Sequence, residues 1–229
     1  AKEESVNTIL EMAEYKKTGS CKVLVVTGCM AQRYKNEIIE EVPEVDAVLG
    51  TTSYGDILKA IREAMEGKHF QEFKDIDYLP EKLGKRVLTT GGHFGYLKIA
   101  EGCDKHCTYC IIPKLRGKFR SVPMERLVTQ AKEMAEEGVK ELILVAQETT
   151  VYGTDIYGKK SLHILLKELC KIKGIRWIRV LYCYPEEIYD ELIQTMKEEK
   201  KICHYLDLPI QHASDRILKR MGRRTTQAE

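Results

Sequence analysis

The chain has 229 residues, of which 43% are hydrophobic and 31% charged, and its formal net charge is +2. This is the composition of a globular protein long enough for two modest domains. The net charge gives no strong polyelectrolyte signal for binding to nucleic acid or to a membrane. No apolar run is long enough for a membrane span or a signal peptide. Eight cysteines in such a chain indicate metal ligands and buried thiols rather than disulfides. We therefore expect a cytoplasmic protein.

The first part of the chain alternates strand and helix signals. Apolar residues recur with helical spacing in 5–17, 31–42 and 53–66, and short Val-rich or apolar runs at 22–27 and 45–50 predict buried strands. This alternation predicts a small N-terminal α/β domain over residues 1–66. Residues 67–92 lose the periodicity and are predicted as a linker, in which only "RVLTT" (86–90) suits a short strand.

In residues 93–229 a predicted strand is repeatedly followed by a predicted amphipathic helix. Strands are predicted at 94–100, 140–146, 175–182 and 203–209, and helices at 123–138, 161–174 and 185–199. The pattern predicts a partial (β/α) barrel. A closed barrel needs more strands, and the first helix is already under way at the start of a chain that lacks an initiator Met. We therefore expect an internal piece of a longer protein, truncated in both domains.

Three cysteines, Cys103, Cys107 and Cys110, directly follow the first barrel strand. In such barrels the loops after the strands carry the active site. Three thiolates can hold three irons of a [4Fe–4S] cluster and leave the fourth iron open to a molecule that offers an amino and a carboxylate group. An electron passed into a sulfonium bound there would cleave it to a carbon radical.

Two other interpretations of the cysteine loop stay open at this point. Zinc could bind the three thiolates with His106 as a fourth ligand, or Cys107 and Cys110 could form a redox pair. His106 immediately precedes Cys107, however, and adjacent residues seldom reach one tetrahedral ion together.

The segment "KIAEGCDKHCTYCIIPKLRG" (98–117) resembles the signature of the radical S-adenosylmethionine enzymes, and within them the methylthiotransferases. "VVTGCMAQRY" (25–34) is similar to the N-terminal domain of that family, and "KFRSVPMERLV" (118–128) follows the cysteine loop as it does there. Two segments, 142–153 and 206–223, resemble the branch that modifies an aspartate of ribosomal protein S-twelve. The departures are Glu148, where that branch more often has Asp, and Val122, where a basic residue is common.

The resemblance implies two [4Fe–4S] clusters and S-adenosylmethionine as cofactors. Cys103, Cys107 and Cys110 would hold the radical cluster. Cys29 would be one ligand of an auxiliary cluster, whose other two ligands the family places upstream of this chain. Tyr109, Gln147 and Glu148 would contact S-adenosylmethionine.

The resemblance also implies the reaction. A methylthio group would be added to the β-carbon of an aspartate in a small-subunit ribosomal protein, with an electron donor such as flavodoxin or ferredoxin. The alternatives are methylthiolation of a tRNA adenosine and a non-catalytic cluster- or zinc-binding module.

The remaining polar residues and cysteines receive plainer interpretations. Cys21, Cys170 and Cys203 are predicted to pack in the interior, whereas Cys183 ends a strand on the active face and stays open. His212 is predicted to be a loop histidine with a local partner. The basic run is either a solvated loop or a contact for a substrate; it consists of Lys114, Arg116, Lys118 and Arg120.

Overall fold

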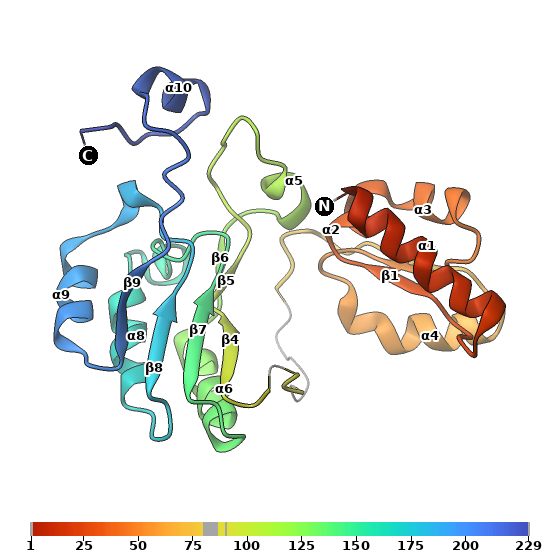
Figure 1. Ribbon diagram of the computed structural model, residues 1–229, viewed down its shortest axis with the longest axis horizontal. Helices are drawn as coiled ribbons and strands as arrows, with labels where there is room; N and C mark the ends of the chain where they lie inside the picture. The colour runs from red at the N-terminus through yellow and green to blue at the C-terminus, as the bar shows by residue number, and fades with distance from the viewer. Residues whose placement is uncertain (1, 80–86, 90, 229) are drawn as a thin grey trace. The chain divides into compact units, whose positions relative to one another are not determined.

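The computed structural model describes residues 2–79, 87–89 and 91–228. The chain forms two compact units (Figure 1). The first comprises the described residues up to 79 together with Lys114–Arg116, and the second comprises those from 87 to 113 and from 117 onwards. No helix within these described ranges has the length and apolar character needed to cross a membrane.

The first unit is a small parallel sheet with helices on both faces. Among the described residues its strands are β1 (Val25–Thr27), β2 (Ala47–Leu49) and β3 (Phe70–Glu72), paired in that order. Its helices are α1 (Lys2–Thr18), α2 (Cys29–Tyr34), α3 (Asn36–Glu41), the single 3₁₀ turn η1 (Tyr54–Asp56) and α4 (Ile57–Met65). Val26 and Val48 pack with Ile38 of α3 on one face, while Ala60 of α4 packs on Ala47 from the other.

Three details of this unit differ from the sequence analysis. The helix predicted over 31–42 is two helices, because Lys35 between them has a φ of 43° and interrupts the right-handed spiral. Strand β3 lies in a segment for which no strand was predicted. For the proposed short strand at 86–90, residues 87–89 form no strand, and positions 86 and 90 lie outside the described residues.

The second unit contains the predicted partial barrel, which is confirmed. Within the described ranges, four parallel strands pair in the order β4 (Phe94–Lys98), β7 (Glu141–Val145), β8 (Trp177–Val180) and β9 (Ile202–Leu206). Helices α6 (Met124–Glu136), α8 (Leu162–Cys170) and α9 (Asp190–Glu198) connect them and cover one face of the sheet (Figure 1). Alternate strand residues point to this face, so Leu97, Leu142, Leu144, Ile178 and Val180 form the core with the helices.

Short elements cluster beyond the carboxyl ends of these strands. They are β5 (Ala100–Glu101) with its antiparallel partner β6 (Arg120–Ser121), α7 (Thr154–Tyr157), the 3₁₀ turn η2 (Pro185–Glu187) and α10 (Asp215–Arg220). Helix α5 (Ile112–Arg116) follows the cysteine loop in the chain, and its last three residues belong to the first unit. Most of these elements are too short to show a periodic apolar pattern and were not predicted. Two predictions are corrected here: the helix predicted over 185–199 begins only at Asp190, after the 3₁₀ turn η2, and Ala100 of the strand predicted over 94–100 belongs to β5. Together they build the surface on which the cysteine loop lies.

Candidate functional site

The loop that carries the three cysteines is closed at its base by the chain that returns towards β6. Cys103 N donates a hydrogen bond of 3.1 Å to Gly117 O, and Phe119 N donates one of 3.0 Å to Asp104 Oδ1. Gly102 has a φ of +77°, and a Cβ there would lie 2.0 Å from Lys118 O. Only glycine permits both this conformation and this close approach. The loop is therefore held in shape before any ligand binds.

All three thiols are free, and their surroundings suit thiolate ligands. Cys103 and Cys107 are buried and Cys110 is half-buried. Two backbone N–H groups point at sulfur: Lys105 N lies 3.4 Å from Cys103 Sγ, and Ile112 N lies 3.4 Å from Cys110 Sγ. Such N–H···S contacts orient a metal-binding sulfur.

The donor set fits an iron–sulfur cluster better than a single zinc ion. Nowhere in the described residues do three or more His, Cys, Asp or Glu side chains gather as ligands around one ion. His106 is exposed and is not part of such a group. In a cubane cluster, by contrast, each thiolate binds its own iron, so three separated soft sulfurs are what it requires. Burial raises the pKa of the Cys103 thiol, chiefly by desolvation, so the positive charge of a metal would be needed to hold it as thiolate.

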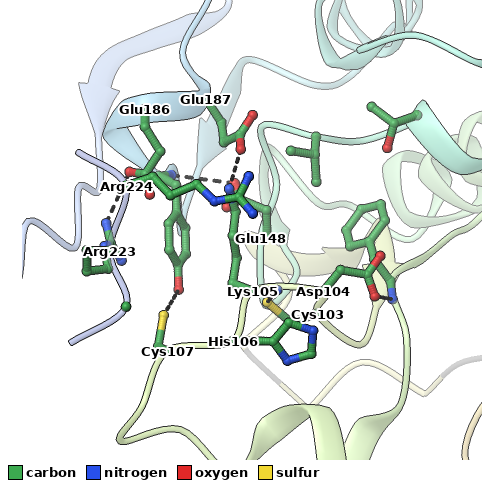
Figure 2. Close-up of a pocket in the computed structure, with 15 residues that line it drawn as sticks. Cys103, Asp104, Lys105, His106, Cys107, Glu148, Glu186, Glu187, Arg223 and Arg224 are labelled. Carbon is green, nitrogen blue, oxygen red and sulfur yellow. Dashed lines mark hydrogen bonds and ion pairs between the residues drawn. The ribbon is translucent and has the colours of Figure 1, made fainter. Parts of the chain in front are cut away.

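Two cavities open beside the loop, and Cys107 and Tyr184 line both. The first, here called the charged cavity, has a volume of about 380 Å³ (Figure 2). Its lining includes Cys103, Lys105, Glu148 and Arg223. The second, here called the aromatic cavity, has a volume of about 400 Å³. Its lining includes Cys110, Tyr109, Gln147, Tyr182 and Gln211.

The three residues expected to contact S-adenosylmethionine divide between these cavities. Tyr109 and Gln147 line the aromatic cavity, where Gln147 Oε1 also accepts a hydrogen bond of 2.8 Å from Gly102 N. Glu148 lines the charged cavity instead. Gln147 and Glu148 lie in the bend that follows β7, and their side chains enter different cavities. The structure therefore brings Tyr109 and Gln147 together and separates Glu148 from them.

Glu148 is a buried carboxylate with one unsatisfied oxygen. It is 1% exposed; its Oε1 accepts hydrogen bonds from Thr150 Oγ1, from Thr150 N at 3.2 Å and from Tyr184 N at 3.5 Å. Its Oε2 has no hydrogen-bond partner among the described residues. Burial raises the pKa of Glu148 to about 7, against the opposing effects of Thr150 and Lys105. A buried carboxyl oxygen left without a partner is typical of a ligand site rather than of a structural residue.

A network of charged residues also lines the charged cavity. Lys105 pairs with Glu187, and Arg223 Nη2 pairs with Glu186 Oε2 at 3.2 Å (Figure 2). Glu187 also pairs with Lys160 at 2.9 Å. Lys105 Nζ lies 5.4 Å and Arg223 Cζ 4.2 Å from the centre of the Tyr184 ring. The sequence analysis missed both the η2 carboxylates and Arg223. The run "KRMGRR" (219–224) was a signal for the latter, but it was used only to assign the branch.

Cys29 lies in the first unit and is exposed. It begins α2 directly after Gly28, whose φ is 95°, so the turn presents the thiol outward. Arg116 Nε, which belongs to the same unit, donates to Cys29 Sγ at 3.1 Å. Cys21 is half-buried, and its Sγ donates a hydrogen bond of 3.5 Å to Val23 O in the segment before β1.

The other singled-out residues have local partners. His212 Nδ1 accepts a hydrogen bond of 2.8 Å from Ser214 N, as expected of a loop histidine. Cys170 and Cys183 are buried and Cys203 is half-buried; Cys183 Sγ lies 3.5 Å from Thr149 Oγ1. In the basic run, the two lysines are exposed and the two arginines are half-buried.

Comparison with known families and proteins agrees with this geometry. The model of the Radical SAM superfamily matches residues 97–229, and that of Uncharacterized protein family UPF0004 matches residues 1–50. Relatives named "Ribosomal protein uS12 methylthiotransferase RimO" are 69% identical in Lachnoclostridium phytofermentans and 56% identical in Clostridium perfringens SM101. Each match covers 100% of this chain and 52% of the relative, so the chain spans about half the length of these curated relatives.

Among solved structures, the cobalamin-dependent S-adenosylmethionine radical enzyme OxsB with aqua-cobalamin and S-adenosylmethionine bound superposes with a TM-score of 0.63. The match covers 98% of this chain and 36% of that one at 17% sequence identity, so it supports the fold alone. The superfamily model, in contrast, covers more than half of the chain and includes the whole cysteine loop. The chain therefore belongs to the Radical SAM superfamily.

Proposed function

We propose that this chain is the central part of a radical S-adenosylmethionine methylthiotransferase that modifies the β-carbon of an aspartate in a small-subunit ribosomal protein. The observation that carries the proposal is the cysteine loop. Three free thiols follow the first barrel strand, and the loop of residues 100–113 contains these three cysteines and no fourth. An open coordination position is what radical cleavage requires.

Cys103, Cys107 and Cys110 would hold the radical [4Fe–4S] cluster, which when bound supplies the electron for reductive cleavage of S-adenosylmethionine. The residues around it have their own tasks. Gly102 and Gln147 fix the start of the loop through the 2.8 Å hydrogen bond between them. The N–H groups of Lys105 and Ile112 orient two of the sulfurs.

The aromatic cavity is the proposed site for the adenosyl part of S-adenosylmethionine. Its volume of about 400 Å³ lies within the usual range of small-molecule sites. Tyr109 and Tyr182 offer aromatic surface and Gln147 offers an amide. Tyr182 and Gln211 have φ values of 58° and 64°, a conformation that non-glycine residues rarely adopt and that clusters at functional sites. Glu148, reaching from the charged cavity, would accept a hydrogen bond from the methionyl amino group.

Cys29 would be one ligand of the auxiliary cluster, at which the methylthio group is prepared. Its exposure and its contact with Arg116 support a ligand role over burial as a small apolar residue. Cys21, the nearest cysteine in sequence, begins the same segment and bonds to its own backbone, so it does not offer a second ligand.

The substrate assignment is supported by the names of the relatives and by the segments 142–153 and 206–223, which match that branch. The reaction needs a one-electron donor, for which flavodoxin or ferredoxin is the proposed class. A ribosomal protein as substrate and free thiols as ligands both favour a cytoplasmic location for the enzyme.

The test is mass spectrometry of ribosomal protein and of tRNA from a strain in which the complete gene is deleted. We expect the methylthio group to disappear from the ribosomal protein and to return when the gene is restored. Loss of methylthioadenosine from tRNA, with the ribosomal protein unchanged, would contradict the proposal and support the tRNA-modifying alternative.

A further inference from the structure

Helix α10 and the turn after it carry a dense group of positive charges. Residues 216–224 contain five Arg or Lys residues and no Asp or Glu. Arg216, Lys219 and Arg220 are exposed and lie three and four positions apart, so they share one face of the helix. Leu218, between them in the chain, is 2% exposed and anchors the helix from another face. We call the three exposed cations the α10 patch.

The protein does not neutralise the charges of the α10 patch. None of the three cations forms an ion pair with a carboxylate of the described residues. Asp215, the one acidic residue of the helix, accepts a hydrogen bond of 2.7 Å from Gln227 N instead. Like charges three or four positions apart on a helix repel each other and destabilise it. An anionic partner would remove this repulsion.

The chain that carries the patch is fastened to the cysteine loop. Thr108 Oγ1 donates a hydrogen bond of 3.1 Å to Arg220 O, and Thr108 N donates one of 3.0 Å to Met221 O. A Cβ on Gly222 would lie 3.7 Å from Cys107 Cα. Figure 1 shows α10 beyond the carboxyl ends of the barrel strands. A protein that docks on the α10 patch would therefore stand next to the cysteine loop.

We propose that the α10 patch is the docking surface for an acidic electron-donor protein. This rests on the proposed function, which requires a donor to reduce the cluster that Cys103, Cys107 and Cys110 would hold. In that step the donor loses one electron and the cluster gains one, and no bond forms or breaks. The donor has to approach the cysteine loop from solvent, and α10 is an exposed helix in direct contact with that loop.

The size of the patch favours a donor protein over nucleic acid. Electron-transfer proteins form small, transient interfaces, and opposite charges on the two partners speed their encounter. Three cations on one short helix suit such a contact. A nucleic-acid surface, in contrast, commonly makes about six to ten phosphate contacts. The net charge of the whole chain is only +2, so no larger excess of positive charge extends the patch.

The experiment compares three variants of the anaerobically reconstituted chain. The patch variant carries Arg216→Gln, Lys219→Gln and Arg220→Gln. The charge-preserving variant carries Arg216→Lys and Arg220→Lys. The control variant removes the same net charge at the amino ends of the strands, from exposed cations in the loops before β8 and β9. Its substitutions are Lys173→Gln, Arg176→Gln and Lys200→Gln.

The probes are an acidic flavodoxin as donor protein and reduced methyl viologen as a small cationic reductant. The first readout is the dissociation constant for oxidised flavodoxin, measured without turnover. The patch variant should bind about three- to a hundredfold more weakly than the control variant. The charge-preserving variant should bind like the wild type. The difference should vanish as salt rises from about 0.1 M to about 1 M, because the screening length falls from about 10 Å to about 3 Å.

The second readout is the rate of 5′-deoxyadenosine formation at a low flavodoxin concentration, divided by the rate with methyl viologen. This ratio should fall in the patch variant and not in the control variant, because only the protein donor has to dock. Urea unfolding of each variant shows whether the fold is retained, which the exposure of all six positions favours.

Three outcomes would contradict these expectations. Equal flavodoxin affinities and equal rate ratios in the patch and control variants, or a wild type that does not bind flavodoxin at low salt, would overturn the docking proposal alone. A patch variant that loses affinity for a small-subunit rRNA fragment, but binds flavodoxin as the control variant does, would overturn it in favour of an RNA contact. A wild type that forms no 5′-deoxyadenosine with methyl viologen would overturn the proposed function, while the flavodoxin affinities would still test the patch.

Discussion

Replacing Gly102 with alanine tests whether the cysteine loop is shaped by close backbone packing. The change should do two things at once. A non-glycine residue at the φ of +77° is strained by about 1–2 kcal/mol. The new Cβ would also lie 2.0 Å from Lys118 O and 2.6 Å from Gly117 O, both backbone atoms that cannot rotate away. Overpacking of this kind costs about 1–3 kcal/mol.

The expected loss is therefore about 2–5 kcal/mol, out of a typical 5–15 kcal/mol for a domain. Gly158→Ala is the matched control. Gly158 has a φ of +70° in the same unit, but no atom lies within 4 Å of the position that its Cβ would take. It should lose only the conformational part, about 1–2 kcal/mol.

The assay is urea unfolding of the reduced, iron-free chain, followed by tryptophan fluorescence. The single tryptophan, Trp177, lies in β8, so the signal reports on the second unit alone. Iron content after reconstitution is the second measurement, and Gly102→Ala should lower it while Gly158→Ala leaves it unchanged. If the two variants unfold at the same urea concentration and load the same iron, the close contact at Gly102 does not shape the loop.

Three further predictions concern the cysteines. Alanine at any one of Cys103, Cys107 or Cys110 should abolish both the cluster absorbance and the formation of 5′-deoxyadenosine, whereas cleavage surviving in the triple variant would refute the ligand assignment. In the longer protein, Cys29→Ala should reduce iron by one cluster and stop methylthio transfer while cleavage of S-adenosylmethionine persists; retained transfer would contradict its auxiliary role. Alkylation at pH 8 should modify exposed Cys29 well before Cys170, because burial raises the pKa of the Cys170 thiol to about 11, so it stays protonated until the pH rises well above 9. Mass spectrometry of the labelled peptides gives the order, and early labelling of Cys170 would show that its helix opens readily.

The long helices and strands of the second unit were predictable because their buried apolar residues recur with the spacing of a helix or a strand. Every second residue of β7 and β8 is buried in the core with the helices, as Leu142, Leu144, Ile178 and Val180 show. This alternation in the sequence predicts a strand with one buried face. The break at Lys35 was not predictable in the same way. It separates two helices of six residues each, and no glycine or proline marks it.

Some residues of the candidate site could likewise be predicted from the sequence and others could not. The three cysteines were recognisable because their spacing alone restricts the chemistry. Gln147 and Glu148 were expected to act together, but they line different cavities, because they lie in the bend after β7, where no periodic pattern of the sequence indicates side-chain direction. Arg223 was missed because its place in the charged cavity depends on burial and on its pairing with Glu186, and neither property is visible in a basic run of the sequence.

The most direct test of the central claim is the yield of 5′-deoxyadenosine when the anaerobically reconstituted chain is mixed with S-adenosylmethionine and a strong one-electron reductant. Liquid chromatography with mass spectrometry measures the product. We expect 5′-deoxyadenosine to form only with iron, sulfide and reductant all present, and to disappear when Cys107 is replaced by alanine. A chain that binds iron through these cysteines yet never forms the nucleoside, whatever the reductant, would contradict the radical chemistry and leave a cluster-binding module in its place.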